Sequence, residues 1–153
     1  MEDFSAKISI LTKLAGEKGE MLKTVLTLTE NQETILQITE DTQETKDFFY
    51  QLSDEKQKYI DMILEKDQLF DKVFTSIDHI FEEEAQNHKE LIRALQDNVR
   101  VASEFDIKIR AVEQNNKTLV VQKYINKKKL NQSMKAPKKE VLDRYRQNTR
   151  DPQ

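Results

Sequence analysis

The sequence predicts an all-α protein: an elongated antiparallel three-helix coiled-coil-like bundle with a flexible basic C-terminal tail. Charged residues make up 35% and hydrophobic residues 37% of the 153 residues, which favours a narrow apolar seam over a thick globular core. Glycine and proline occur only as Gly16, Gly19, Pro137 and Pro152, so nothing interrupts a long helical body between the two pairs. Within that body, apolar side chains recur at steps of three and four, the period of one helix face.

The first helix is expected over about residues 3–39. Gly16 and Gly19 lie inside it and predict either a bend or a frayed start, since each glycine costs a helix about 1 kcal/mol relative to alanine. The predicted apolar face consists of Phe4, Ile8, Leu11, Leu14, Met21, Val25, Leu28 and Ile35.

The second helix is expected over about residues 46–84, after the stretch TEDTQETKD (39–47), which lacks apolar side chains and contains several capping residues. Its seam alternates steps of three and four without a slip. Two lysines occupy seam positions, and we expect their stems to lie along the seam while their charges reach water. The seam consists of Phe49, Leu52, Lys56, Tyr59, Ile63, Lys66, Phe70, Val73, Ile77 and Ile80.

The third helix is expected over about residues 88–130, because the apolar stripe changes register after Ile80. A hairpin near 83–88 explains the change, with Asn87 as a helix cap and Glu90 completing a capping box. One continuous helix with a register slip remains the alternative. The new stripe consists of Ile92, Leu95, Val99, Ala102, Phe105, Ile109, Val112 and Leu119.

We expect two parts, a bundle domain over residues 1–132 and a basic tail over residues 133–153. Residues 1–122 hold 15 basic and 25 acidic side chains, a net charge of −10, whereas residues 123–153 hold 10 and 3, a net charge of +7. Pro137 should end any helix that enters the tail. Beyond it, Val141, Leu142 and Tyr145 form one short amphipathic turn, which we expect to fold on a partner.

The sequence contains no catalytic constellation, so an enzyme is not expected, and neither is a cofactor. Cysteine is absent, which excludes thiol catalysis and cysteine-ligated zinc. His79 with Glu83, or Glu84 with His88, can share a helix face as metal ligands, but a solvated acidic helix end explains the same residues, and no metal is expected. No apolar run approaches the roughly 20 residues that cross a bilayer, so we expect a cytoplasmic protein without membrane insertion.

Three stretches resemble the FlgN-type flagellar export chaperones: LTLTENQETIL, FFYQLSDEKQKYIDMILEKDQLFDKVF and IRAVEQNNKTLVVQKYINKKKLNQ. The chain is also similar to the FliT-type chaperones, and the choice between the two families stays open. The FlgN resemblance implies a cytoplasmic export chaperone. Such a protein binds the C-terminal helices of the flagellar hook-filament junction proteins and delivers them to the export gate of the flagellar type III apparatus.

The expected partner-binding face lies late in the third helix, where the apolar surface exceeds what one seam needs. The predicted contacts are Leu119, Val120, Val121, Tyr124 and Ile125, together with Val141, Leu142 and Tyr145 in the tail. The resemblance also makes Tyr124 a candidate contact for the export gate. The long seams leave a homodimer open.

Two alternatives belong to other classes of function. A nucleic-acid-binding regulator would place Lys127, Lys128 and Lys129 against phosphates, although the acidic body disfavours this and few aromatic residues are available for stacking. A helical coiled-coil adaptor or spacer would use the helices as structure alone.

Overall fold

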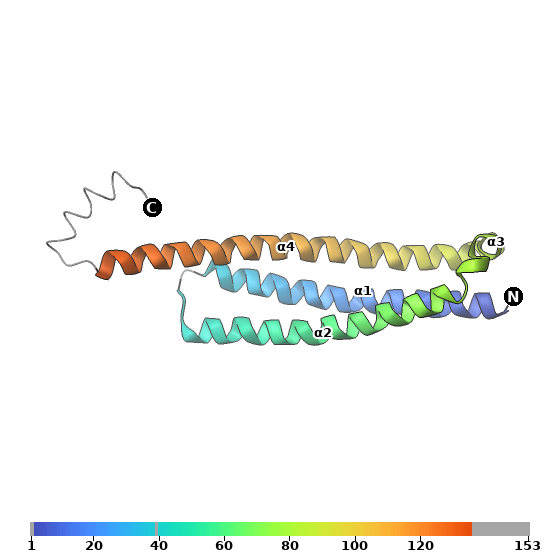
Figure 1. The fold of residues 1–153 in the computed structure, drawn as a ribbon, viewed down its shortest axis with the longest axis horizontal. Helices are drawn as coiled ribbons and strands as arrows, with labels where there is room; N and C mark the ends of the chain where they lie inside the picture. Colours follow the sequence, from blue (N-terminus) through green and yellow to red (C-terminus); the bar gives the residue numbers. More distant parts are fainter. Residues whose placement is uncertain (1, 39, 136–153) are drawn as a thin grey trace. The chain divides into compact units, whose positions relative to one another are not determined.

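The computed structural model describes residues 2–38 and 40–135, and the side chains of residues 3–38 and 40–132. This part of the chain is all-α and contains no β-strand. The chain divides into two compact units, residues 1–116 and 117–153. Its helices are α1 (Glu2–Gln37), α2 (Gln43–Thr75), the 3-10 turn η1 (Asp78–Ile80), α3 (Phe81–Ala85) and α4 (Lys89–Lys135) (Figure 1).

α2 packs along α1 in the opposite direction. In the first half of α1, Lys18 Nζ lies 2.8 Å from Asp67 Oδ1. Near the end of α1, Gln32 Nε2 donates a hydrogen bond to Ser53 Oγ at 2.7 Å. The contact positions fall along α2 as they rise along α1, so the two helices are antiparallel.

Within residues 1–116, α4 packs against α1 and runs in the same direction. Asn98 Nδ2 donates to the carbonyl oxygen of Thr12 at 2.9 Å, and Asn116 Nδ2 donates to the carbonyl oxygen of Thr29 at 3.3 Å. α4 also meets α2, through the ion pair of Lys56 and Glu113. Each of the long helices therefore contacts the other two.

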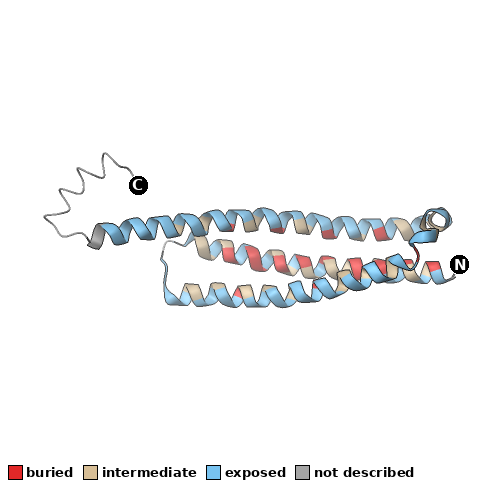
Figure 2. Cartoon of the chain, viewed as in Figure 1, coloured by how far each residue is buried: buried red, intermediate tan, exposed pale blue. Residues whose placement is uncertain are grey.

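Most of the buried residues in the described part of the chain belong to α1, as Figure 2 shows. Phe4, Ile8 and Leu11 are fully buried, so the start of α1 is not frayed, and the helix continues through both glycines. The first core cluster consists of Phe4, Ile8, Leu11, Ala15, Ile77 and Leu95. The second consists of Leu22, Val25, Ile63, Ala102 and Ile109. The second cluster takes residues from α1, α2 and α4. The first takes residues from α1, from α4 and from Ile77, which follows α2, and Phe70, Val73 and Phe74 of α2 pack against it. One helix alone cannot bury these side chains.

A capping box starts α2. The Thr42 side chain accepts a hydrogen bond from the Thr45 backbone N–H at 3.2 Å, and the Thr45 hydroxyl oxygen accepts one from the Thr42 backbone N–H at 3.1 Å. Two backbone donors that have no helical partner are thereby satisfied. Both residues come from the polar stretch in which the sequence predicted a break.

The second break begins earlier than expected, because α2 ends at Thr75 rather than near residue 84. The chain continues through η1 and α3 before α4 begins, so residues 75–89 are not one continuous helix. These short turns bring Phe81 to 6.0 Å from Phe4 and 5.4 Å from Phe74, measured between ring centroids. Apolar burial against α1 explains why the chain leaves the regular helix here.

The cap of α4 lies one residue beyond the expected Asn87. The carbonyl oxygen of His88 accepts the Ile92 N–H at 3.0 Å, the first bond of the helix. The His88 ring also packs against Phe4, with 5.3 Å between ring centroids. His88 therefore both precedes the first residue of α4 and contacts the start of α1.

Candidate functional site

The predicted partner-binding residues of the late third helix lie on α4, in the unit that begins at Lys117. The exposed fractions are 46% for Val120, 56% for Val121, 66% for Tyr124 and 44% for Ile125. Leu119 is half-buried. The other three predicted contacts, Val141, Leu142 and Tyr145, lie outside the described residues.

Val120, Val121, Tyr124 and Ile125 share one helix face, and we call these four residues the apolar face. At about 100° per residue, they span an arc of about 140°. Side chains at i, i+1, i+4 and i+5 cover two successive turns, so they form one continuous surface. Such a surface is wider than the seam of a two-stranded coiled coil and suits a docked helix.

Other exposed apolar side chains of α4 do not form a comparable surface. Ile107 is 67% exposed, but Ser103, Glu104 and Arg110 occupy positions around it on the helix. Val101 lies within 4.0 Å of the position that a Cβ on Gly19 would take. Isolated apolar side chains at a protein surface are common, whereas the apolar face places four together.

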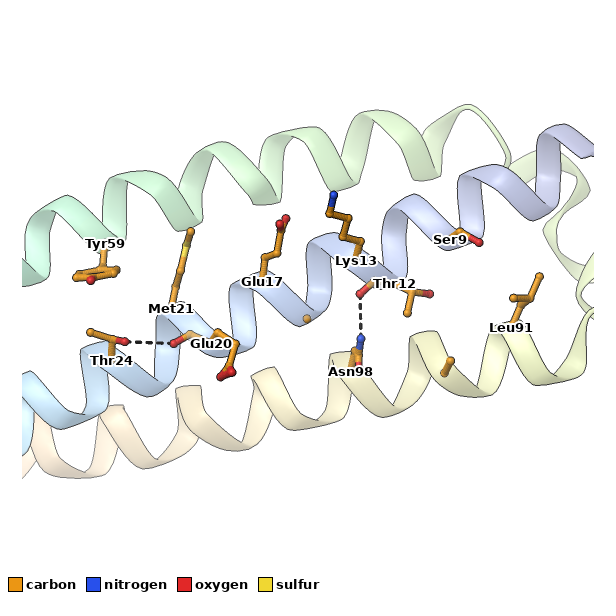
Figure 3. A pocket seen from close by; sticks show the side chains of 12 residues that line it. Ser9, Thr12, Lys13, Glu17, Glu20, Met21, Thr24, Tyr59, Leu91 and Asn98 are labelled. Atoms are coloured by element: carbon orange, nitrogen blue, oxygen red, sulfur yellow. Dashed lines mark hydrogen bonds between the residues drawn. The ribbon is translucent and has the colours of Figure 1, made fainter.

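A groove of about 750 Å³ runs along α1 within residues 1–116 (Figure 3). Met21 and Tyr59 lie at one end of it, and Leu91 and Asn98 lie on the α4 side. Its walls also carry Ser9, Thr12, Lys13, Glu17, Glu20 and Thr24. Most of its exposed lining is apolar, but hydroxyls and charges of both signs are interspersed along it, unlike the four apolar side chains of the face on α4.

Gly16 lets the Asn98 amide cross this groove. A Cβ built on Gly16 would lie 3.1 Å from Asn98 Nδ2, closer than ordinary van der Waals contact. That same nitrogen donates to the Thr12 carbonyl at 2.9 Å (Figure 3). The glycine is therefore explained by the close approach of a side chain from α4, a role that the sequence pattern did not reveal.

A polar layer crosses the interior of residues 1–116 near the end of α1. Lys56 Nζ donates to Gln32 Oε1 at 2.8 Å and pairs with Glu113. Gln32 is 2% exposed and also donates to Ser53. The seam pattern predicted that the charge of Lys56 would reach water. In the structure its ammonium group instead contacts Gln32 and Glu113. Lys66 departs from the prediction in the same way, since it pairs with Glu17 at 3.1 Å.

Asn116 belongs to the same end of the unit. It is 6% exposed, and its Oδ1 atom has no hydrogen-bond partner in the structure. Its Nδ2 atom bonds the Thr29 carbonyl. Buried polar groups usually have hydrogen-bond partners. Asn116 therefore makes its bond to Thr29 while its own carbonyl oxygen stays unsatisfied.

The two histidines do not lie in a metal-binding cluster. No group of three or more metal-ligating side chains occurs in the described part of the chain. His88 Nδ1 lies 3.0 Å from the carbonyl oxygen of Glu84, one turn before it. The ring thus contacts backbone on one side and Phe4 on the other.

Within the described residues, no helix has the length and apolar character needed to span a bilayer. A comparison of the chain with protein-family models, with curated proteins and with solved structures finds no match in any of the three.

Proposed function

We propose that this protein is a cytoplasmic export chaperone of the FlgN type. Its cargo would be the C-terminal helices of the flagellar hook-filament junction proteins, which it would deliver to the flagellar type III export gate. The observation that supports this proposal is the apolar face, whose four side chains are all between 44% and 66% exposed.

Burial of such a face by a partner helix is favourable, because apolar surface leaves water on both helices. An amphipathic helix offers anchors at i, i+3, i+4 and i+7, and the spacing of Val120, Val121, Tyr124 and Ile125 matches that period. A junction protein's terminal helix needs similar cover, since its own apolar side would otherwise associate before export. Helix-in-groove packing would therefore serve both proteins.

The fold that we propose for this function is an elongated antiparallel three-helix bundle with a basic C-terminal tail. Residues 1–116 would act as the scaffold, because both core clusters lie there. Tyr124, the most exposed member of the apolar face, is our candidate for contact with the export gate after cargo release.

The test is a binding titration of the full chain with the C-terminal helical segments of the junction proteins. We expect Val121→Glu combined with Ile125→Glu to weaken binding by at least about tenfold, because two charges would enter an apolar contact. Ile107→Glu is the matched control, since Ile107 is at least as exposed and lies on the same helix. It should leave the affinity unchanged.

Two results would overturn the proposal. Unchanged affinity in the double variant would remove the apolar face from the contact. Absence of any binding by the unmodified chain would remove the junction proteins as cargo. A homodimer formed through the same face would instead appear as a concentration-dependent mass that the double variant abolishes.

A further inference from the structure

Five lysines surround the apolar face on α4. Between Glu113 and Glu140 the sequence contains no Asp or Glu. Over residues 117–132, Lys117, Lys127, Lys128 and Lys129 are exposed and Lys123 is half-buried. This segment of helix therefore combines exposed apolar side chains with positive charge alone.

The earlier part of α4 arranges its charges differently. Residues 89–113 contain five basic and five acidic side chains, a net charge of zero. Several pair along the helix surface: Arg110 lies 2.9 Å from Asp106, and Arg100 lies 3.6 Å from Glu104. Residues 114–135 contain no Asp or Glu, so the lysines of this segment cannot form such pairs within it. Like charges four residues apart, such as Lys123 and Lys127, disfavour the helix instead.

The lysines are placed in a regular way around the apolar face. Lys117, Val121, Tyr124 and Lys128 follow one another at steps of four, three and four, so they form one row along the helix. Lys117 and Lys128 thus stand at the two ends of the apolar row. Their backbones are separated by eleven residues, or about 16 Å at 1.5 Å per residue.

We propose that the partner of this face is an amphipathic helix whose apolar row is bounded at both ends by carboxylates about eleven residues apart. Each carboxylate would lie opposite Lys117 or Lys128, while apolar side chains between them cover Val121 and Tyr124. The partner charge would also reduce repulsion among the lysines. This inference rests on the proposed function only for the natural source of the helix.

An acidic helix fits these residues better than a nucleic acid. Phosphate backbones gain nothing from Val120, Val121 and Ile125, which lie between the lysines. Residues 111–143 also contain no arginine, the residue that suits bidentate phosphate contacts. The exposed apolar surface therefore favours an acidic amphipathic helix over a nucleic acid as the partner.

The test uses synthetic helical peptides with an identical apolar row and different ends. One carries glutamates eleven positions apart, the second carries glutamines there, and the third carries lysines. We expect the glutamate peptide to bind about five- to tenfold more tightly than the glutamine peptide and the lysine peptide to bind weakest. The advantage of glutamate should disappear between about 50 and 500 mM salt, because exposed charges are screened.

Two protein variants make the assignment specific. Lys117→Gln with Lys128→Gln should remove the preference for glutamate. Lys58→Gln with Lys72→Gln removes the same charge from exposed positions of α2 and should keep the preference. Lys117→Glu with Lys128→Glu should reverse it in favour of the lysine peptide. Circular dichroism establishes that each variant retains the helical content of the unmodified chain.

Equal affinity for all three peptides, or a preference that the first double variant retains, would overturn the inference. Displacement of the glutamate peptide by an oligonucleotide at equal charge concentration, with no dependence on the apolar row, would assign the lysines to nucleic acid instead. If the junction-protein helices fail to bind while the glutamate peptide binds, the proposed function fails and this inference stands. If the junction-protein helices bind the variant with Lys117→Gln and Lys128→Gln as tightly as the unmodified chain, the proposed function stands and this inference fails.

Discussion

Two parts of α4 use similar amino acids in different ways. Up to Asn116, the apolar side chains Leu95, Ala102 and Ile109 are buried against α1 and α2. From Lys117 onward, Val120, Val121, Tyr124 and Ile125 are exposed. Helix propensity and periodicity hardly change at this boundary, so they do not determine burial. What differs is exposure: the row up to Asn116 is covered by α1 and α2, whereas the apolar face is exposed, as the proposed binding role requires.

The largest test of this contrast compares the same substitution in both parts. Leu95→Ala should lower the free energy of unfolding by about 2–5 kcal/mol, because Leu95 is 6% exposed and its removal leaves a cavity. Leu130→Ala should change it by less than about 0.5 kcal/mol, since Leu130 is 59% exposed. Urea denaturation followed by circular dichroism measures both. Equal losses would mean that the two parts are covered to the same extent.

The polar layer at Gln32 and Lys56 offers a second, smaller test. Glu113→Ala should destabilise the protein by about 1–3 kcal/mol, because it removes the ion-pair partner of a largely buried lysine. Lys56→Met, which removes the charge and keeps an apolar stem, should cost less than Glu113→Ala. Thermal unfolding compares the two variants. A larger loss in Lys56→Met would show that the hydrogen bond from Lys56 to Gln32 contributes more than the cost of leaving the lysine charge without Glu113.

The two glycines of α1 provide a third test, of how closely α4 approaches α1. Gly19→Ala should raise the free energy of unfolding by up to about 1 kcal/mol, since the added Cβ would meet Val101 only at ordinary contact distance. Gly16→Ala should gain less, because its Cβ would press on Asn98 and weaken the bond to Thr12. Denaturant titration of both variants checks the order. Equal gains would mean that the Asn98 amide moves aside freely.

The smallest expected effect concerns the lysines beyond residue 116. Lys127→Glu should stabilise the local helix by a few tenths of a kcal/mol, because it replaces repulsion with Lys123 by attraction. Slower amide exchange over residues 120–130, with exchange over residues 89–110 unchanged, would establish the effect. Faster exchange would indicate that the lysine run already has a stabilising partner within the chain.

Periodicity predicted the inward positions of α2 well. All ten seam residues of the predicted second helix are buried or half-buried, the eight within α2 as well as Ile77 and Ile80 after its end, because a strict alternation of three and four leaves only one face for packing. In the third helix, the predicted stripe includes Val99, an apolar residue four positions after Leu95. Val99 is 41% exposed, and the inward positions are Asn98 and Asn116. Continuing steps of three and four from Leu95 would have selected both asparagines.

The polar contacts could not be predicted because they depend on pairs of helices. Gln32 continues the α1 row from Val25 and Leu28 at steps of three and four, and that position was the available signal for its burial. The sequence around Gln32 does not indicate that Lys56 and Ser53, which lie on another helix, are its hydrogen-bond partners. The turns between residues 75 and 89 were missed for a related reason: Phe81 turns toward Phe4, which lies far away in the sequence. For the apolar face, the surplus of apolar side chains was visible in the sequence, and the exposure of Val120, Val121, Tyr124 and Ile125 agrees with it.

The two asparagine contacts between α4 and α1 also constrain how the lengths of these helices can change. Thr12 and Thr29 are 17 residues apart on α1, and their donors Asn98 and Asn116 are 18 apart on α4. A single inserted residue between either pair would rotate one amide by about 100° away from its carbonyl, although every side chain in the contacts would still be present. Whole-heptad insertions made in both helices would restore the alignment. Both contacts can therefore be kept only if α1 and α4 change length together between them.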